Sequence, residues 1–169
     1  LFVAIIVSLI VKTFLFDAFV VRGDSMAPNF KDGDYLFLDK ISYYFYKPQR
    51  GEVAVVKSRD VDKNMIKRVV GLPGERIEIK NGRVVVKDSR SSPDKILEET
   101  YLPSGTATPI DTVITLDDRE YFLMGDNRFS SEDSRTIGPF SLPRFKGRAL
   151  FSASFNSSSL LPQINFIFK

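Results

Sequence analysis

The sequence has no cysteine and no histidine among its 169 residues. The absence of cysteine excludes thiol nucleophiles and disulfides. The absence of histidine excludes a Ser-His-Asp triad, and without either residue the usual zinc sites are excluded as well. Any nucleophilic chemistry in this chain must therefore take its base from another type of side chain.

Positive charge is in small excess. The net charge is +3 and the basic residues do not cluster with aromatic ones, so we expect no nucleic-acid partner. A content of 43% apolar and 27% charged residues is typical of a globular protein. The length of 169 residues fits one domain with a sizeable core.

The amino-terminal segment is the most apolar part of the chain. Residues 1–11, LFVAIIVSLIV, contain one polar side chain, Ser8. This run is shorter than the roughly 20 residues that cross a bilayer. Asp17 at mid-membrane would cost about 2.5–3.5 kcal/mol, so a span must end near Lys12 to Phe16. We expect residues 1–16 to be the last part of a transmembrane helix that begins upstream; the alternative is a buried helix of a soluble protein.

The rest of the sequence predicts strands, which are β-branched or aromatic runs bounded by Gly, Pro or Asp. They are Tyr35–Lys40, Glu52–Lys57, Met65–Val70, Arg76–Lys80, Arg83–Lys87, Glu120–Met124 and Gly147–Phe155. Asn81-Gly82 predicts a hairpin turn, because both positions must accept a positive φ. Residues 17–159 are expected to form one mainly β domain, with residues 88–118 as a short accessory excursion.

The carboxyl-terminal residues 160–169, LLPQINFIFK, form an apolar tail. The run is too short to span a bilayer. It could lie in the membrane interface with Lys169 reaching the headgroups, or it could form a last strand that completes the β core.

Two residues can supply nucleophilic chemistry. Ser25 lies in a Gly-Asp-Ser turn of the segment VVRGDSMAPNFKDGDYLFLDK. Lys67 lies in the apolar strand MIKRVV, where alternation places Met65, Lys67 and Val69 on one face. Burial would lower the lysine pKa from about 10.4 toward about 7–8, and a neutral amine can serve as a general base. The alternative is an ordinary strand lysine whose amine reaches solvent.

A third polar cluster is GDNRFSSEDSR, Gly125 to Arg135. Asp126, Asn127, Asp133 and Arg135 can hydrogen-bond one another, as in a structural loop. Ser131 could instead donate to the lysine amine and orient it. The segment GLPGE lacks the Lys-Ser/Thr that completes a phosphate-binding loop, so a nucleotide site is not favoured.

These segments together resemble the type I signal peptidases. GDSMAP, DGDYLFLDK, RGEVAVVK, MIKRVVGLPGE and YFLMGDNRFSSEDSRTIGPF follow the order and spacing of that family, from Phe14 to Phe155. Its members are membrane-anchored Ser/Lys proteases that remove signal peptides from exported proteins, after small residues in an A-x-A pattern. The resemblance implies an antiparallel β-sheet body with a single-pass helix in the cytoplasmic membrane. The catalytic domain would lie on the extracytoplasmic side.

The resemblance also implies roles for individual residues. Ser25 would be the nucleophile and Lys67 the general base, with Ser131 hydrogen-bonded to the lysine. Asp133 and Arg135 would brace the site. Gly23 occupies a position where some members have a serine whose hydroxyl helps form the oxyanion hole, so backbone N–H groups such as that of Ser25 would serve here.

The family's substrate pockets correspond to apolar positions that could equally be core residues. They are Phe19, Val21, Met26, Phe30, Met65 and Ile66. The implied partners are the signal peptides of preproteins emerging from the export translocon, and the lipid bilayer. Since the lysine does the acid–base work, we expect neither a metal nor another cofactor.

Three other functions are open to this sequence. Organelle inner-membrane processing peptidases share all these motifs. Self-cleaving SOS repressors also use a serine and a lysine, but they lack KRVVGLPGE and GDNRxxSxDSR, and their Ala-Gly cleavage site has no counterpart here. A non-catalytic β module that binds extended peptides is the third, and the intact Ser25, Lys67 and Ser131 argue against it.

Overall fold

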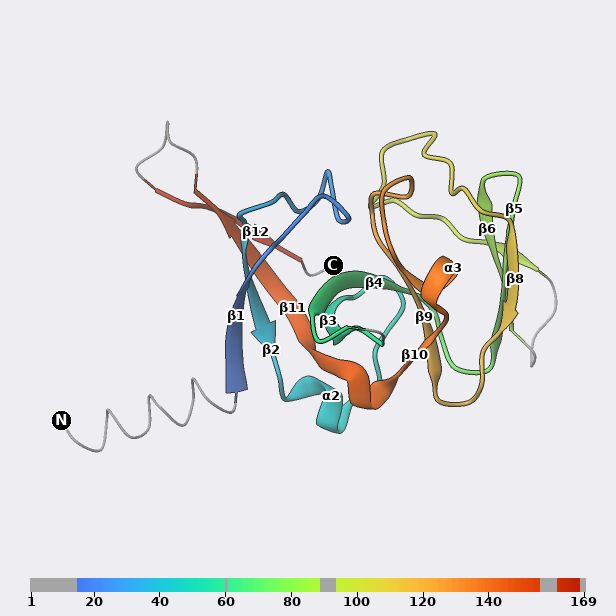
Figure 1. The fold of residues 1–169 in the computed structure, drawn as a ribbon, viewed down its shortest axis with the longest axis horizontal. Coiled ribbons are helices and arrows are strands. Elements are labelled where there is room, and N and C mark those ends of the chain that lie inside the picture. The colour runs from blue at the N-terminus through green and yellow to red at the C-terminus, as the bar shows by residue number, and fades with distance from the viewer. Residues whose placement is uncertain (1–14, 60, 89–93, 156–160, 168–169) are drawn as a thin grey trace.

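The computed structural model of the chain describes residues 15–59, 61–88, 94–155 and 161–167. The described part is mainly β, with two antiparallel sheets (Figure 1). The larger sheet has the order β1-β2-β11-β3-β4-β9-β10, with β12 paired to β11, and it curls into a half-barrel. The smaller sheet has the order β7-β6-β5-β8.

The strands of the larger sheet are β1 (Phe16–Val20), β2 (Tyr35–Asp39), β3 (Val53–Lys57), β4 (Asn64–Gly71), β9 (Glu120–Met124), β10 (Phe140–Ser141), β11 (Phe145–Ser154) and β12 (Gln163–Phe166). Those of the smaller sheet are β5 (Glu75–Lys80), β6 (Arg83–Asp88), β7 (Lys95–Ile96) and β8 (Thr112–Thr115). The helices are short: α2 (Ser42–Phe45), α3 (Ser134–Ile137) and the 3-10 turn η2 (Leu142–Arg144).

All seven strands predicted from the sequence are present, with ends that agree within about two residues. The predicted hairpin joins β5 and β6, where Lys80 pairs with Arg83. Asn81 has φ 51° and Gly82 has φ 73°, as this turn requires.

One expectation needs correction, and the excursion contains strands that the sequence did not indicate. Phe16 is the first residue of β1 and pairs with Asp39, so the predicted helix cannot extend to this position. The excursion of residues 88–118 contains two strands, β7 and β8, which pair with β6 and β5. Both strands are very short, and β8 has the pattern TVIT with half-exposed side chains, so neither produced a clear hydrophobic signal.

The predicted membrane anchor, residues 1–16, lies outside the described residues apart from its last two positions. Among the residues that the structure describes, no helix is long and apolar enough to cross a membrane.

The core is divided among three apolar clusters, and β3 separates two of them. Val53 and Val55 of β3 face the cluster under the Ser25 loop, whereas Ala54 and Val56 face the cluster formed with β4, β9 and β10. Successive side chains of a strand point to opposite faces, so a strand buried on both faces has a continuous apolar sequence. The third cluster lies between β9 and the smaller sheet.

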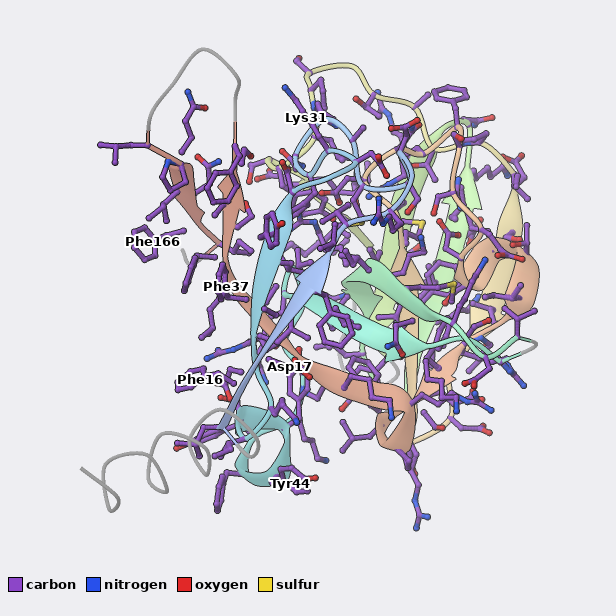
Figure 2. The ribbon with its side chains drawn as sticks, turned by 60° about the vertical axis from the view of Figure 1, so that its left-hand side comes forward. Phe16, Asp17, Lys31, Phe37, Tyr44 and Phe166 are labelled. Atoms are coloured by element: carbon purple, nitrogen blue, oxygen red, sulfur yellow. The ribbon has the colours of Figure 1, made fainter. Side chains whose placement is uncertain are left out.

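Residues 163–166 of the carboxyl-terminal tail form a strand, which was the second of the two predicted alternatives. β12 pairs with β11, and all four of its side chains are exposed, so it extends the sheet without entering the core. Phe37 stacks on Phe151 at 4.4 Å between ring centroids, and Phe151 lies 5.9 Å from Phe166. Figure 2 shows Phe16, Phe37 and Phe166 on the same side of the molecule.

Candidate active site

Ser25 lies in the loop between β1 and β2, which its own apolar residues hold in place. Backbone hydrogen bonds from Val21 N to Asp34 O (2.8 Å) and from Gly33 N to Val21 O (3.0 Å) close the loop. Met26 and Phe30 are 1% and 3% exposed and pack into the cluster below. Ser25 itself remains half-exposed at the rim, where a hydroxyl can reach a substrate.

The Lys67 amine donates a hydrogen bond of 2.8 Å to Ser25 Oγ. Lys67 is 3% exposed, and on its own strand it shares a face with Met65 and Val69, as alternation predicted. Burial lowers its pKa from 10.5 to about 8, although Asp133 and Glu132 act in the opposite direction. The structure therefore brings a serine hydroxyl into contact with an amine that is partly neutral near pH 8.

Ser131 lies close to this pair, but the expected hydrogen bond between Ser131 and the Lys67 amine is absent. The buried Ser131 Oγ acts on the Asp133 carboxyl, whose pKa it helps to lower. The side chain instead fills the space where a Cβ on Gly125 would lie, next to the Ser25 carbonyl. A side chain at position 125 would therefore displace both serines, and Gly125 is the residue that permits this close packing.

Asp133 and Arg135 form a buried ion pair behind Ser131. The guanidinium donates to the carboxylate through Nε (2.8 Å) and Nη2 (2.7 Å), and both side chains are almost fully buried. Burial alone would raise the pKa of Asp133, but the hydrogen bonds and charge of Arg135 and the N–H of Gly125 hold it below its ordinary value. Asp133 also caps α3 by accepting from the Arg135 N–H, so the pair shapes the loop itself.

A second ion pair joins Arg68, the residue after the lysine, to Asp126. Arg68 donates to both oxygens of the carboxylate, at 2.8 and 2.6 Å, and to the Gly51 carbonyl at 2.8 Å. From the sequence, Asp126 was predicted only as a loop residue and Arg68 was not predicted to have a role. The dipeptide Lys67-Arg68 could have indicated the pair, because a charged residue on the opposite face of a buried strand needs a partner.

Asn127 connects the same loop to the backbone around Ser25. Its backbone N–H donates to the Ser25 carbonyl at 3.0 Å, and its side-chain amide donates to the Asp24 carbonyl at 3.2 Å. The loop after β9 thus holds the backbone on both sides of the Asp24–Ser25 bond.

Gly23 has φ 77°, and its N–H donates to Asp32 Oδ1 at 2.7 Å. Because that N–H is engaged, it is not available to an oxyanion. The Ser25 N–H makes no hydrogen bond with any described residue, so it can serve as a donor at the position where negative charge would develop.

The candidate pocket residues fall into two groups. Val21, Met26 and Phe30 are almost completely buried, with Phe19 and Ile66 only partly buried against the same cluster. Met65 belongs to the cluster on the other face of β4. Phe19 and Ile66 are therefore the less buried of the predicted residues on the side of the Ser25 loop, and Met65 lies on the face of β4 that it shares with Lys67.

These features define a class of site: a serine hydroxyl in contact with a buried lysine amine, at the rim of a curled antiparallel sheet, in a chain without histidine. Such a site can perform nucleophilic attack with the amine as base.

Comparisons with known proteins agree with that class. Residues 1–153 match the sequence model of the family described as signal peptidase, peptidase S26. A probable signal peptidase I-1 of Synechocystis is 34% identical over 161 residues, which cover 89% of this chain and 78% of the relative. Signal peptidase I P of Bacillus subtilis subsp. natto is 33% identical, over 79% of this chain and 74% of the relative.

A solved structure shows the same fold. The crystal structure of a signal peptidase I from Enterococcus faecalis V583 superimposes with a TM-score of 0.51 at 25% identity, over 61% of this chain and 97% of that one. The chain therefore belongs to the signal peptidase family, peptidase S26, and is a serine endopeptidase.

The buried amine predicts that Lys67 reduces the stability of the folded chain. Lowering a pKa from 10.5 to about 8 means that the ammonium form is disfavoured by roughly 3 kcal/mol, partly offset by the bond to Ser25. Lys67→Met should therefore raise the free energy of unfolding at pH 7 by about 2 kcal/mol in urea denaturation.

The pH dependence has a definite sign. Between pH 8 and 10.5 the unfolded chain binds more protons at this lysine than the folded chain does, so the wild type gains stability as pH rises. The advantage of Lys67→Met should shrink across that window. Lys146→Met, at an exposed position of β11, serves as the control and should show neither effect. A Lys67→Met variant less stable than wild type at pH 7 would contradict the assignment.

Proposed function

We propose that this chain removes amino-terminal signal peptides from exported preproteins, with Ser25 as nucleophile and Lys67 as general base. The observation that carries the proposal is the 2.8 Å contact between Ser25 Oγ and a lysine whose pKa burial lowers to about 8. The names of the relatives, which are signal peptidases I, support the substrate class.

The steps follow from the geometry. The neutral Lys67 amine takes the Ser25 proton as the oxygen attacks the carbonyl carbon of the scissile bond. The Ser25 N–H donates to the developing oxyanion. The lysine then gives its proton to the leaving amine, which leaves an acyl group on Ser25. Water, deprotonated by the same amine, attacks the ester and restores the serine.

The substrate is proposed to bind as an added strand between β1 and β4. β1 lies at the edge of the larger sheet. β9 pairs with β4 only from Arg68 onward, so within the described part of the chain the β9 side of residues 64–67 has no strand partner. Open backbone groups on both strands can hydrogen-bond an extended peptide. This arrangement brings the peptide past Ser25, with Phe19 and Ile66 beside small side chains before the cut.

The site is proposed to operate at the outer face of a membrane. The apolar residues 1–14 lead directly into β1, so an anchor there would hold the open edge of the sheet near the bilayer. Preproteins emerging from the export translocon present their cleavage sites on the extracytoplasmic side of the cytoplasmic membrane. The proposed reaction uses no metal or other cofactor.

Ser25→Ala and Lys67→Ala should each abolish cleavage of a preprotein, because one removes the nucleophile and the other the base. The loss should exceed about a thousandfold in kcat, as expected when a residue of a catalytic unit is removed. Gel analysis of precursor and mature product measures it. Ser130→Ala is a matched control. Ser130 is an exposed serine three residues after Asn127 in the sequence, so this variant should retain activity. Robust cleavage by either active-site variant would refute the mechanism.

The rate should depend on pH through the state of Lys67. Only the neutral amine accepts a proton, so kcat/KM should rise about tenfold per pH unit below the lysine pKa of about 8 and level off above it. Steady-state cleavage of a signal-peptide substrate between pH 5 and pH 10 tests this. A profile that is flat from pH 5 upward would show that another group is the base.

Ile66→Ala should relax the selection for alanine next to the cut, because it enlarges the pocket beside Ser25. Competition between substrates with alanine, valine or leucine at that position measures the change. Ile96→Ala is the matched control, since Ile96 is an exposed isoleucine of β7 and its loss should leave the ratios unaltered. If Ile66→Ala keeps the wild-type selectivity, or if Ile96→Ala changes it equally, the pocket is assigned to the wrong residue.

A further inference from the structure

Residues 97–109, the middle part of the excursion of residues 88–118, lie beside the loop of residues 125–128 that follows β9 (Figure 1). The Glu99 carboxylate binds the Arg128 guanidinium through both oxygens, with one distance of 2.8 Å. The Tyr101 hydroxyl donates to the same carboxylate at 2.6 Å. Thr108, from the end of the excursion, accepts a third bond from Arg128 at 2.6 Å.

Arg128 is the most deeply buried cation of this region, with a side chain that is 0% exposed. Its Nε donates to the Gly125 carbonyl at 3.1 Å, and its own carbonyl accepts from Arg135 at 2.6 Å. A buried guanidinium that loses its carboxylate is strongly destabilised. Glu99 therefore provides the charge that allows Arg128 to remain inside the loop of residues 125–128.

The excursion also reaches the lysine strand. The Tyr101 ring lies under the Arg68 guanidinium, 4.1 Å from its central carbon, and Arg68 follows Lys67 in β4. Asn29, four residues after Ser25, donates to the Tyr101 carbonyl and to Asp126, both at 2.8 Å. One short segment thus contacts the supports of both members of the Ser25–Lys67 pair.

The connection to the nucleophile is short. The Gly125 carbonyl is held by Arg128, the Gly125 N–H by Asp133, and the Asn127 N–H holds the Ser25 carbonyl at 3.0 Å. Gly125 also packs so closely on Ser25 and Ser131 that a shift of this loop must move one of them. The distance between Ser25 Oγ and the Lys67 amine consequently depends on where Arg128 lies.

We infer that Glu99 is a positioning residue for the peptidase reaction: by binding Arg128 and Tyr101 it sets the loop that places Ser25 against Lys67. The inference rests on the proposed function of the pair. The excursion is then a part of the active-site support, although its polar sequence resembles a dispensable surface loop. Glu99 touches no reacting atom and acts through Arg128, Gly125 and Asn127.

Glu99→Gln keeps the shape of the side chain and removes its charge. We expect kcat for a preprotein to fall by about ten- to a hundredfold, because small displacements of reacting groups have effects of this size. KM should stay within about twofold, since the proposed substrate strands β1 and β4 are not altered. Glu98→Gln, the same substitution at the exposed neighbouring residue, should match the wild type in both constants.

A double-mutant cycle separates positioning from simple stability. Asn127→Ala removes the side-chain bond to the Asp24 carbonyl, further along the same connection. If Glu99 acts through this loop, the double variant should lose less kcat than the product of the two single losses. Tyr101→Phe removes one bond to Glu99 but keeps the ring under Arg68, so it should lower kcat by less than Glu99→Gln does. This variant tests the inference if Glu99→Gln does not fold.

All rates are measured well below the unfolding temperature of each variant. The inference is overturned if Glu99→Gln and Tyr101→Phe lower the unfolding temperature but keep the wild-type kcat, or if the losses in the cycle multiply fully. It is also overturned if Glu98→Gln loses as much kcat as Glu99→Gln. Absence of peptidase activity in the wild-type chain would instead refute the proposed function, so the two failures are distinguishable.

Discussion

The burial of the Lys67 amine is the constraint to which the rest of the site responds. An amine on an exposed strand would remain protonated near neutral pH and could not accept a proton from a serine. Here Met65, Val69 and the strands on either side exclude water, and the pKa falls to about 8. The curled sheet provides this environment because β3 and β9 flank β4 and bury most of its length.

Keeping one amine poorly solvated requires that the other charges nearby be paired. Arg68 with Asp126, Arg128 with Glu99, and Arg135 with Asp133 form three largely buried ion pairs around Ser25 and Lys67. Each pair also donates to backbone carbonyls, so their hydrogen-bonding capacity is largely used within the protein. Buried pairs of this kind contribute little net stability, but they hold polar loops in one arrangement. That arrangement leaves Lys67 with Ser25 Oγ as its hydrogen-bond acceptor.

The strand β9 contributes side chains to the cores of both sheets. Tyr121 and Leu123 pack with β4 in the larger sheet, whereas Phe122 and Met124 pack against the smaller sheet. The polar loop that follows β9 is consequently supported from both sides, by the lysine strand and by the excursion that belongs to the smaller sheet. Gly125, at the junction, allows the close approach between that loop and Ser25.

Sequence alone was sufficient for properties that depend on neighbours along the chain. Strand alternation, the Asn81-Gly82 turn and the lack of histidine led to the β fold and to Lys67 as the candidate base, and the motif resemblance identified Asp133 and Arg135. The tertiary structure decided which distant residues meet: Lys67 with Ser25 across 42 positions, Glu99 with Arg128 across 29, and Ser131 against Gly125 without a bond to the lysine. Local patterns follow from backbone sterics and side-chain periodicity, whereas these contacts depend on strand order and loop closure, which no short stretch of sequence contains.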